Sequence, residues 1–181
     1  YFEIEQAEED KQYGVSKENR PLPIVEMGLF MDMDGIPIAF DITPGNGNEQ
    51  NTMIPLEKKI LDKFSMSKFI VCTDSGLSSG TNRYFNTYDK EDGNRSFITT
   101  QSIKKLKSHL KKWALDPTGW QLAGSSSIKK YDIRELDDTD DREKIFFKSR
   151  WIREKTEIHE NGQVKTVELE QKLIVSYSIK Y

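Results

Sequence analysis

The chain has 181 residues, of which 35% are hydrophobic and 31% are charged, and its formal net charge is −3. This length suits one domain, or a core with a subdomain, and the hydrophobic share is sufficient for a packed interior. No apolar run approaches the roughly 18 residues of a membrane-spanning helix, and the single cysteine, Cys72, excludes an internal disulfide framework and favours a reducing, cytoplasmic environment.

The charges are unevenly distributed along the chain. Residues 1–10 hold five acids and no base, and residues 137–143 hold five acids against one base. Residues 104–112 carry no acid but five lysines, which are Lys104, Lys105, Lys107, Lys111 and Lys112. Such a basic face can contact phosphate although the net charge is negative. The alternative is a solvated helix surface, which charge alone favours.

The first quarter of the chain reads as strands. Residues 1–5 alternate with period two and predict a strand, and residues 6–22 predict a polar loop. Two β-rich runs follow, at 24–31 and 36–42, with Asp34-Gly35 between them. Asp-Gly predicts a hairpin because both positions of a type I′ turn need a positive φ. The second run ends at Pro44-Gly45-Asn46-Gly47-Asn48.

Helices and strands then alternate. Residues 52–64 predict a helix that Thr52 caps and whose inner face holds Met53, Leu56, Ile60, Leu61 and Phe64. Residues 68–73 form a continuous apolar run, typical of a central strand covered on both faces, and this places Cys72 in the core. We expect a short helix near 81–88, a turn at 91–94, a strand at 95–100 and an amphipathic helix over 102–115, which Asp116-Pro117 ends.

The last third of the chain is mainly β. Residues 145–158 and 163–181 are two long β-like runs, and the Asn161-Gly162 pair between them predicts a hairpin. The whole order indicates an α/β fold with a mixed sheet, a hairpin plus parallel strands, flanked by helices. An RNase H-like fold has this order, as do other α/β folds. We place the core at residues 1–127 and a mainly antiparallel β subdomain at 128–181.

Asp74 is the candidate site residue with the clearest physical basis. It directly follows the most apolar strand and precedes Ser75-Gly76. Sites of open α/β sheets lie at the carboxyl ends of strands, and a carboxylate there can hold a hard cation such as Mg²⁺. The alternative is an ordinary turn in which the aspartate bonds its own backbone, and the local sequence alone favours that turn. His109 and His159 lack partners at metal spacing, which argues against zinc.

Several segments together resemble the DDE transposases of bacterial insertion sequences, particularly those with a β-rich insertion in an RNase H-like core. Each segment is unspecific alone, but the ordered set is specific and covers nearly the first hundred residues. The segments are Tyr13-Gly14-Val15-Ser16-Lys17-Glu18-Asn19-Arg20-Pro21, Gly28-Leu29-Phe30-Met31-Asp32, Asp34-Gly35-Ile36-Pro37-Ile38, Pro44-Gly45-Asn46, Thr52 with its helix, and Ile70-Val71-Cys72-Thr73-Asp74-Ser75-Gly76.

The resemblance implies a metal-dependent reaction on DNA. In that family three carboxylates hold two divalent metals, Mg²⁺ or Mn²⁺, which activate a water or a DNA 3′-hydroxyl for in-line attack on a phosphodiester. Asp74 matches the second carboxylate. The first is expected before Tyr1 and the third after Tyr181, so the chain is expected to be a fragment that is inactive alone and does not hold the metals by itself. Asp41 and Glu3 are the fallbacks for the first, whereas Tyr131 and Arg134 lack the glutamate that would complete the third motif.

The resemblance also implies partners. DNA, as transposon ends and target, is expected to contact Lys17, Arg20 and the lysines of residues 104–112, and the full transposition complex is expected to hold a homodimer. The section from residue 128 resembles the insertion that helps hold DNA in relatives. Two alternatives stay open: an RNase H-like nuclease without strand transfer, and a non-catalytic nucleic-acid-binding domain on the same fold.

Overall fold

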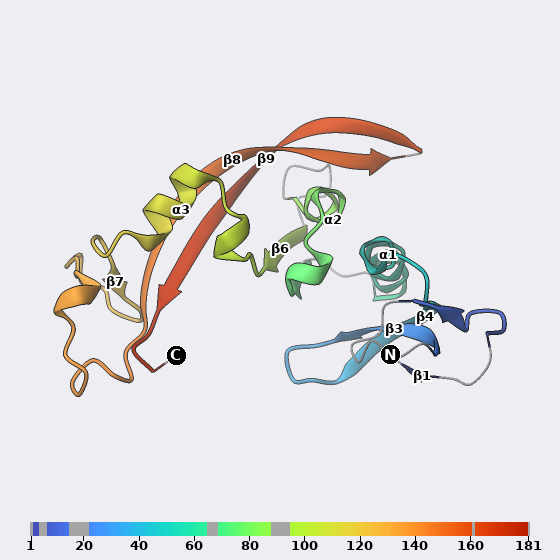
Figure 1. The fold of residues 1–181 in the computed structure, drawn as a ribbon, viewed down its shortest axis with the longest axis horizontal. Coiled ribbons are helices and arrows are strands. Elements are labelled where there is room, and N and C mark those ends of the chain that lie inside the picture. The colour runs from blue at the N-terminus through green and yellow to red at the C-terminus, as the bar shows by residue number, and fades with distance from the viewer. Residues whose placement is uncertain are drawn as a thin grey trace. The chain divides into compact units, whose positions relative to one another are not determined.

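The computed structural model describes residues 2–3, 7–14, 22–64, 69–87, 95–160 and 162–180. The chain divides into two compact units, Tyr1–Thr100 and Gln101–Tyr181, which are described separately below. The fold is mixed α/β, and strands predominate over helices in the described ranges (Figure 1). None of the helices described there is long and apolar enough to cross a membrane.

The first unit is built on an antiparallel hairpin. Strand β3 (Pro23–Met31) pairs with β4 (Pro37–Pro44), with Met27 opposite Ile42 and Leu29 opposite Phe40. The predicted hairpin is confirmed, but its turn is not of type I′: Gly35 has a φ of 82°, whereas Asp34 does not have a positive φ. The Asp32 carboxylate accepts from the backbone N–H of Ile36 at 2.8 Å.

Two short strands extend this sheet, β1 (Phe2–Glu3) and β2 (Gln12–Tyr13), and both pair antiparallel with β3. Val25 pairs with Phe2 on one side and with Pro44 on the other, so β1 and β4 lie on opposite edges of β3. The predicted loop over residues 6–22 therefore contains one short strand in its described part.

Helix α1 (Met53–Phe64), preceded by the 3₁₀ turn η1 (Glu49–Asn51), packs on one face of the hairpin. Its inner face is Met53, Leu56 and Ile60, as predicted. Phe64 was expected there but is 51% exposed, because burial along the helix ends at Ile60 and Phe64 belongs to the last turn. The Thr52 hydroxyl donates to the Glu49 carbonyl at 2.9 Å, within η1.

The other face of the hairpin is apolar and open. Period-two alternation along both strands places five large side chains on it, each between 43% and 64% exposed: Met27, Leu29, Met31, Phe40 and Ile42. This face carries no charged side chain between Met27 and Met31 or between Phe40 and Ile42. The hydrophobic alternation of the sequence thus correctly located two faces, but only one is covered.

A parallel pair completes the first unit. Strand β5 (Phe69–Thr73) lies beside β6 (Arg95–Thr99), and the connection between them includes η2 (Ser75–Leu77) and α2 (Gly80–Phe85). The prediction that β5 is covered on both faces was wrong, because Val71 is buried while Ile70 is 64% exposed and Cys72 is also exposed. In the described part of the chain β5 pairs with β6 alone, and only one of its faces is packed.

The second unit begins with η3 (Ile103–Lys105) and α3 (Ser108–Leu115) rather than with one long helix. Leu106 and Lys107 interrupt the predicted helix with extended backbones, with ψ of 146° and 145°. Lysines at the amino-terminal end of a helix oppose its dipole, and α3 has no acid in its first turn to offset them. The helix consequently starts later than its apolar spacing suggests.

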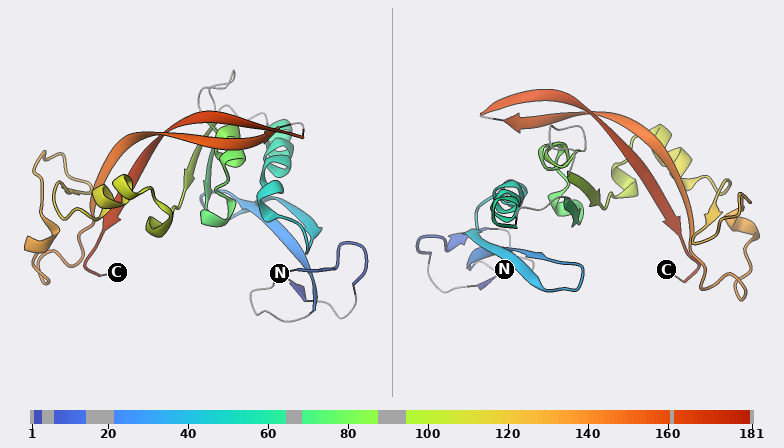
Figure 2. Two further views of the ribbon diagram at one scale, coloured as in Figure 1. Left: turned by 45° about the horizontal axis from the view of Figure 1, so that its top comes forward. Right: turned by 180° about the vertical axis from the view of Figure 1, so that it is seen from behind.

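The rest of this unit is a sheet of β7 (Gln121–Leu122), β8 (Phe146–Glu160) and β9 (Gln163–Tyr177), with η4 (Ile133–Glu135) in the loop before β8. β8 and β9 form a long twisted antiparallel ribbon, which Figure 2 shows clearly. Gly162, at its turn, has a φ of 74°, which fits the predicted hairpin, although Asn161 lies outside the described residues.

A buried lysine sits in the core of the second unit. The Lys148 ammonium lies 4.5 Å from the Trp120 ring centroid and 5.3 Å from that of Trp113, and it donates to the Asp116 carbonyl at 2.6 Å. The Trp120 ring N–H donates to the same carbonyl at 3.0 Å. Trp120 is buried and Trp113 is half-buried, whereas Trp151 on β8 is 65% exposed.

Candidate functional site

Asp74 stands at the carboxyl end of β5, with an exposed side chain. Its Oδ1 accepts from the backbone N–H of Gly76 at 2.8 Å and caps η2, so the turn considered as an alternative is indeed formed. Its carbonyl accepts from the Thr99 hydroxyl at 3.1 Å, which ties it to the neighbouring strand. Among the described residues Oδ2 has no hydrogen-bond partner, so one oxygen is anchored and the other can take a ligand.

The loop that follows Asp74 is held from a distance by Gln50 of η1. The Gln50 side-chain amide donates to the Gly76 carbonyl, and its Oε1 accepts from the Ser79 backbone N–H at 2.9 Å. The Gln50 carbonyl accepts from Asn82 Nδ2 at 3.0 Å, and the same nitrogen donates to the Leu77 carbonyl at 3.0 Å. The loop carrying the candidate ligand is therefore fixed by partners more than twenty residues upstream as well as by its own turn.

Glu49, beside Gln50, approaches Asp74 across Gly76. A β-carbon on Gly76 would lie 2.9 Å from Asp74 Oδ1 and 3.0 Å from Glu49 Oε1. Such distances are too short for an ordinary contact, so glycine at this position leaves room both for Asp74 Oδ1, which the Gly76 N–H holds, and for Glu49 Oε1. The sequence interpretation missed Glu49. The signal was that it follows directly on the Pro44–Asn48 turn, where Asn48 caps η1 through the Gln50 N–H at 3.0 Å.

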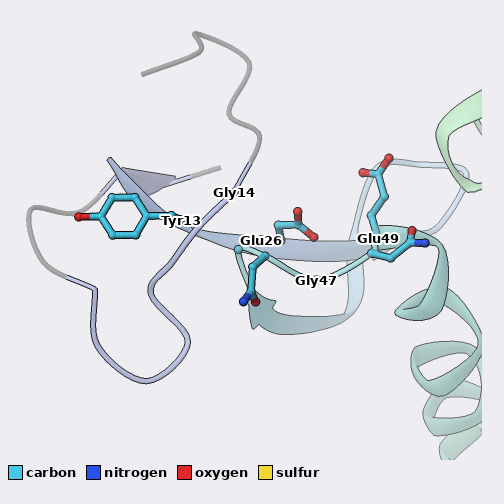
Figure 3. A pocket seen from close by; sticks show the side chains of 8 residues that line it. Tyr13, Gly14, Glu26, Gly47 and Glu49 are labelled. Atoms are coloured by element: carbon cyan, nitrogen blue, oxygen red, sulfur yellow. The ribbon is translucent and has the colours of Figure 1, made fainter. Parts of the chain in front are cut away.

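A third carboxylate, Glu26 on β3, lies in a hollow of about 500 Å³ beside Glu49. Figure 3 shows Tyr13 at one end of this hollow and Glu49 at the other, with Glu26 between them. Glu26 Oε2 is buried and has no hydrogen-bond partner in the described ranges. Burial, and secondly the charge of Glu49, raise the pKa of Glu26 above its ordinary value. Negative charge is thus concentrated at this end of the unit.

Two glycines allow the backbone segments around the hollow to meet. A β-carbon on Gly14 would overlap the Gly45 carbonyl, and one on Gly45 would overlap the Ile24 carbonyl. The Gly45 N–H donates to the Asp10 carbonyl at 3.2 Å. Tyr13-Gly14 and Pro44-Gly45-Asn46, which carry part of the sequence resemblance, are therefore brought together by backbone packing.

A second buried acid, Glu57 on α1, lies in the first unit. The Glu57 side chain is 0% exposed, and Asn86 Nδ2 donates to its two oxygens at 3.1 and 2.9 Å. Burial raises the pKa of Glu57 to about 7, against the lowering effects of the Asn86 hydrogen bond and the Arg95 charge. The sequence interpretation missed it, although Met53, Leu56, Glu57 and Ile60 follow the i, i+3, i+4, i+7 spacing of a buried helix face.

The other candidate residues are distributed over both units. The five lysines of residues 104–112 are exposed on η3, α3 and the link between them, in the second unit. Lys17 and Arg20 lie outside the described residues, as does the side chain of Glu3. Asp41, the other fallback, is paired with Lys59 of α1 at 3.2 Å. Arg134 is paired with Asp132, and Tyr131 packs on Phe146 at 5.2 Å between ring centroids, so both are structural.

The donor set near Asp74 fits a hard cation in part. Over the residues that the structure describes, no group of three or more His, Cys, Asp or Glu could hold a metal ion. Asp74 and Glu49 nevertheless present two carboxylates on either side of Gly76, and Mg²⁺ is commonly held by one or two carboxylates with waters and substrate phosphates. Searches against protein-family models, curated proteins and solved structures found no match to the chain.

Proposed function

We propose that this chain is part of the catalytic core of a DDE transposase and supplies Asp74 as one carboxylate of a metal-dependent DNA cleavage and strand-transfer site. The observation that supports it best is the geometry of Asp74. The side chain lies at the carboxyl end of a parallel strand, with one oxygen fixed by the Gly76 N–H and the other open. Sites of α/β sheets occupy this position.

The strand arrangement supports an RNase H-like core as the fold of this site. Such a core needs an antiparallel hairpin and parallel strands joined by helical crossovers, and β3–β4 and β5–β6 supply these elements. β1 pairs with the edge of β3 that faces away from β4, and Phe30 of β3 contacts Phe69 of β5 with 6.4 Å between ring centroids. We propose that the strand continuing β1 carries the first carboxylate near this edge.

A divalent cation, Mg²⁺ or Mn²⁺, is the cofactor that this proposal requires, with Asp74 as ligand and Glu49 as a second carboxylate whose side chain approaches Gly76. When bound, such a cation acts as a Lewis acid that activates the attacking oxygen and stabilises the charge on the leaving oxygen. The chain's own contribution is to hold Asp74 Oδ1 on a backbone N–H and to leave Oδ2 toward solvent. Glu49 adds negative charge that favours a cation over an anion at this position.

DNA is the proposed partner, as transposon ends and target, within a homodimeric complex in the cytoplasm. The support is the exposed set of five lysines over residues 104–112, with no acid in that stretch. Phosphate contacts release counterions, so their binding should weaken steeply with salt. Within the same proposal the β8–β9 ribbon belongs to an insertion that helps hold DNA.

The test is Asp74→Asn in the protein that carries this chain with its further carboxylates. The amide keeps an oxygen for the Gly76 N–H, so the turn survives while the charge is lost. Excision and strand transfer should fall at least a hundredfold, whereas Asp41→Asn, which removes a carboxylate paired with Lys59, should retain them. Excision by Asp74→Asn at the wild-type rate would refute the assignment.

The same assay separates the two alternatives. A nuclease would cleave DNA in an Asp74-dependent way without joining the ends to a target. A non-catalytic nucleic-acid-binding domain would bind DNA equally well with Asp74 or Asn at this position and would cleave none.

A further inference from the structure

Gln50 connects the turn before α1 with the loop that carries Asp74. The two segments are 26 to 29 residues apart along the chain, yet one amide side chain bonds to both Gly76 and Ser79. Its backbone carbonyl adds the bond from Asn82, a buried residue whose amide also holds Leu77. Gln50 thus bonds to the loop at Gly76 and at Ser79, and its carbonyl also bonds to Asn82 near the beginning of α2.

One of these bonds holds Gly76, the residue whose N–H bonds to the Asp74 carboxylate. Gly76 uses its N–H to hold Asp74 Oδ1 and its carbonyl to accept from Gln50. Since both groups belong to one glycine without a side chain, the peptide planes around Gly76 turn freely unless a partner fixes them. Gln50 supplies that partner for the carbonyl of the glycine whose N–H holds Asp74 Oδ1.

Glu49 is connected to the loop through its backbone, because it directly precedes Gln50. Glu49 and Gln50 are consecutive in η1, where Asn48 caps the turn and Thr52 closes it. The bonds of Gln50 to the loop therefore hold the turn that carries Glu49 beside the loop that carries Asp74.

We infer that Gln50 is a positioning residue for the cation site proposed at Asp74: it holds the 76–79 loop so that Asp74 and Glu49 face one divalent cation. This inference rests on the proposed function. Partners that orient metal ligands typically change metal affinity 10- to 100-fold when they are removed. A merely structural latch would lower stability without changing cation affinity.

The test is a Mn²⁺ titration of the protein that carries this chain with its further carboxylates, followed by paramagnetic broadening of backbone amide signals around Asp74 and Gly76. Gln50→Met keeps the length of the side chain but removes both of its polar bonds. Thr52→Val is the matched control, since it removes the hydroxyl bond to Glu49 inside the same turn and leaves the loop bonds intact. Asp74→Asn reports on the proposed site itself, and thermal unfolding is recorded for every variant.

The inference predicts at least a tenfold loss of Mn²⁺ affinity for Gln50→Met, wild-type affinity for Thr52→Val and loss of site-specific broadening for Asp74→Asn. Wild-type affinity in Gln50→Met, or an equal loss in Gln50→Met and Thr52→Val, overturns the positioning role while the proposed function stands. Absence of broadening in the wild type, or its persistence in Asp74→Asn, overturns the proposed cation site and the positioning role with it. The Asp74→Asn arm therefore distinguishes the two failures.

Discussion

The buried carboxyl of Glu57 gives the first unit a pH-dependent stability. Its pKa is raised to about 7 in the folded chain from an ordinary value of 4.5. The folded state therefore holds a proton that the unfolded state has lost between these values, and stability decreases as the pH rises. The contribution is fully present below pH 4.5 and is lost as the pH passes about 7. One pKa unit is worth about 1.4 kcal/mol, so the whole effect is about 3 kcal/mol.

Glu57→Gln removes the ionisable group while keeping the size of the side chain. The new amide needs an acceptor, and Asn86 Oδ1 is buried without a hydrogen-bond partner among the described residues. A flipped Asn86 amide can satisfy it, at the expense of the Asn86 bond to the Asn82 carbonyl. A lost hydrogen bond costs about 1 kcal/mol. We expect the variant to be less stable than the wild type by about 1 kcal/mol at pH 4.5 and more stable by about 2 kcal/mol at pH 8.

Urea unfolding between pH 4.5 and pH 8 measures this, with amide hydrogen exchange in α1 as the local readout. Tryptophan fluorescence is unsuitable because Trp113, Trp120 and Trp151 all lie in the second unit. Asp62→Asn, an exposed carboxyl on the same helix, is the matched control and should keep the pH dependence of the wild type. A wild-type α1 whose protection is the same at both ends of this range would refute the reasoning, since Glu57 would then be ionised throughout.

Two further predictions follow from close packing. Gly76→Ala places a β-carbon 2.9 Å from Asp74 Oδ1 and 3.0 Å from Glu49 Oε1, so these oxygens must shift. A Mn²⁺ titration of the protein with its further carboxylates should show at least tenfold weaker binding, and unchanged binding would contradict a cation site beside Gly76. Lys148→Met removes the bond to the Asp116 carbonyl and the contacts with Trp113 and Trp120, and should cost the second unit about 2 kcal/mol in tryptophan-monitored unfolding. Lys172→Met on exposed β9 is its control, and equal effects of the two substitutions would argue against a role of the cation in the core.

Local signals in the sequence were sufficient for most elements of the fold. Asp34-Gly35 predicted the hairpin because its turn requires a backbone that glycine adopts easily, and Gly35 has that backbone. The apolar run ending at Thr73 correctly predicted β5 and the position of Asp74 at its end. The sequence did not predict which faces of β5 are covered. Cys72 is exposed although its run is apolar, because the packing of a strand depends on which neighbours reach it and not on its own composition.

Of the residues at the candidate site, the sequence predicted only Asp74. Asp74 follows a strand and could be selected by position, but its neighbours Glu49 and Gln50 come from a turn more than twenty residues earlier. Their approach depends on tertiary contacts around Gly76 that no local pattern encodes. Glu57 differs, because its helical spacing with Met53 and Ile60 places it on the buried face of α1, a signal that was present in the sequence but that the sequence interpretation missed.

Packing explains some of the residues that carry the sequence resemblance but not Asp74. Gly14 and Gly45 are required by backbone segments that leave no space for a β-carbon, so they would be needed in this fold whatever the chain does. Asp74 has an exposed side chain, and an asparagine would cap η2 as well as it does. The fold therefore needs an oxygen at this position but not a charge. The exchange of Asp74 for asparagine is therefore the substitution that separates the requirements of folding from those of the proposed chemistry.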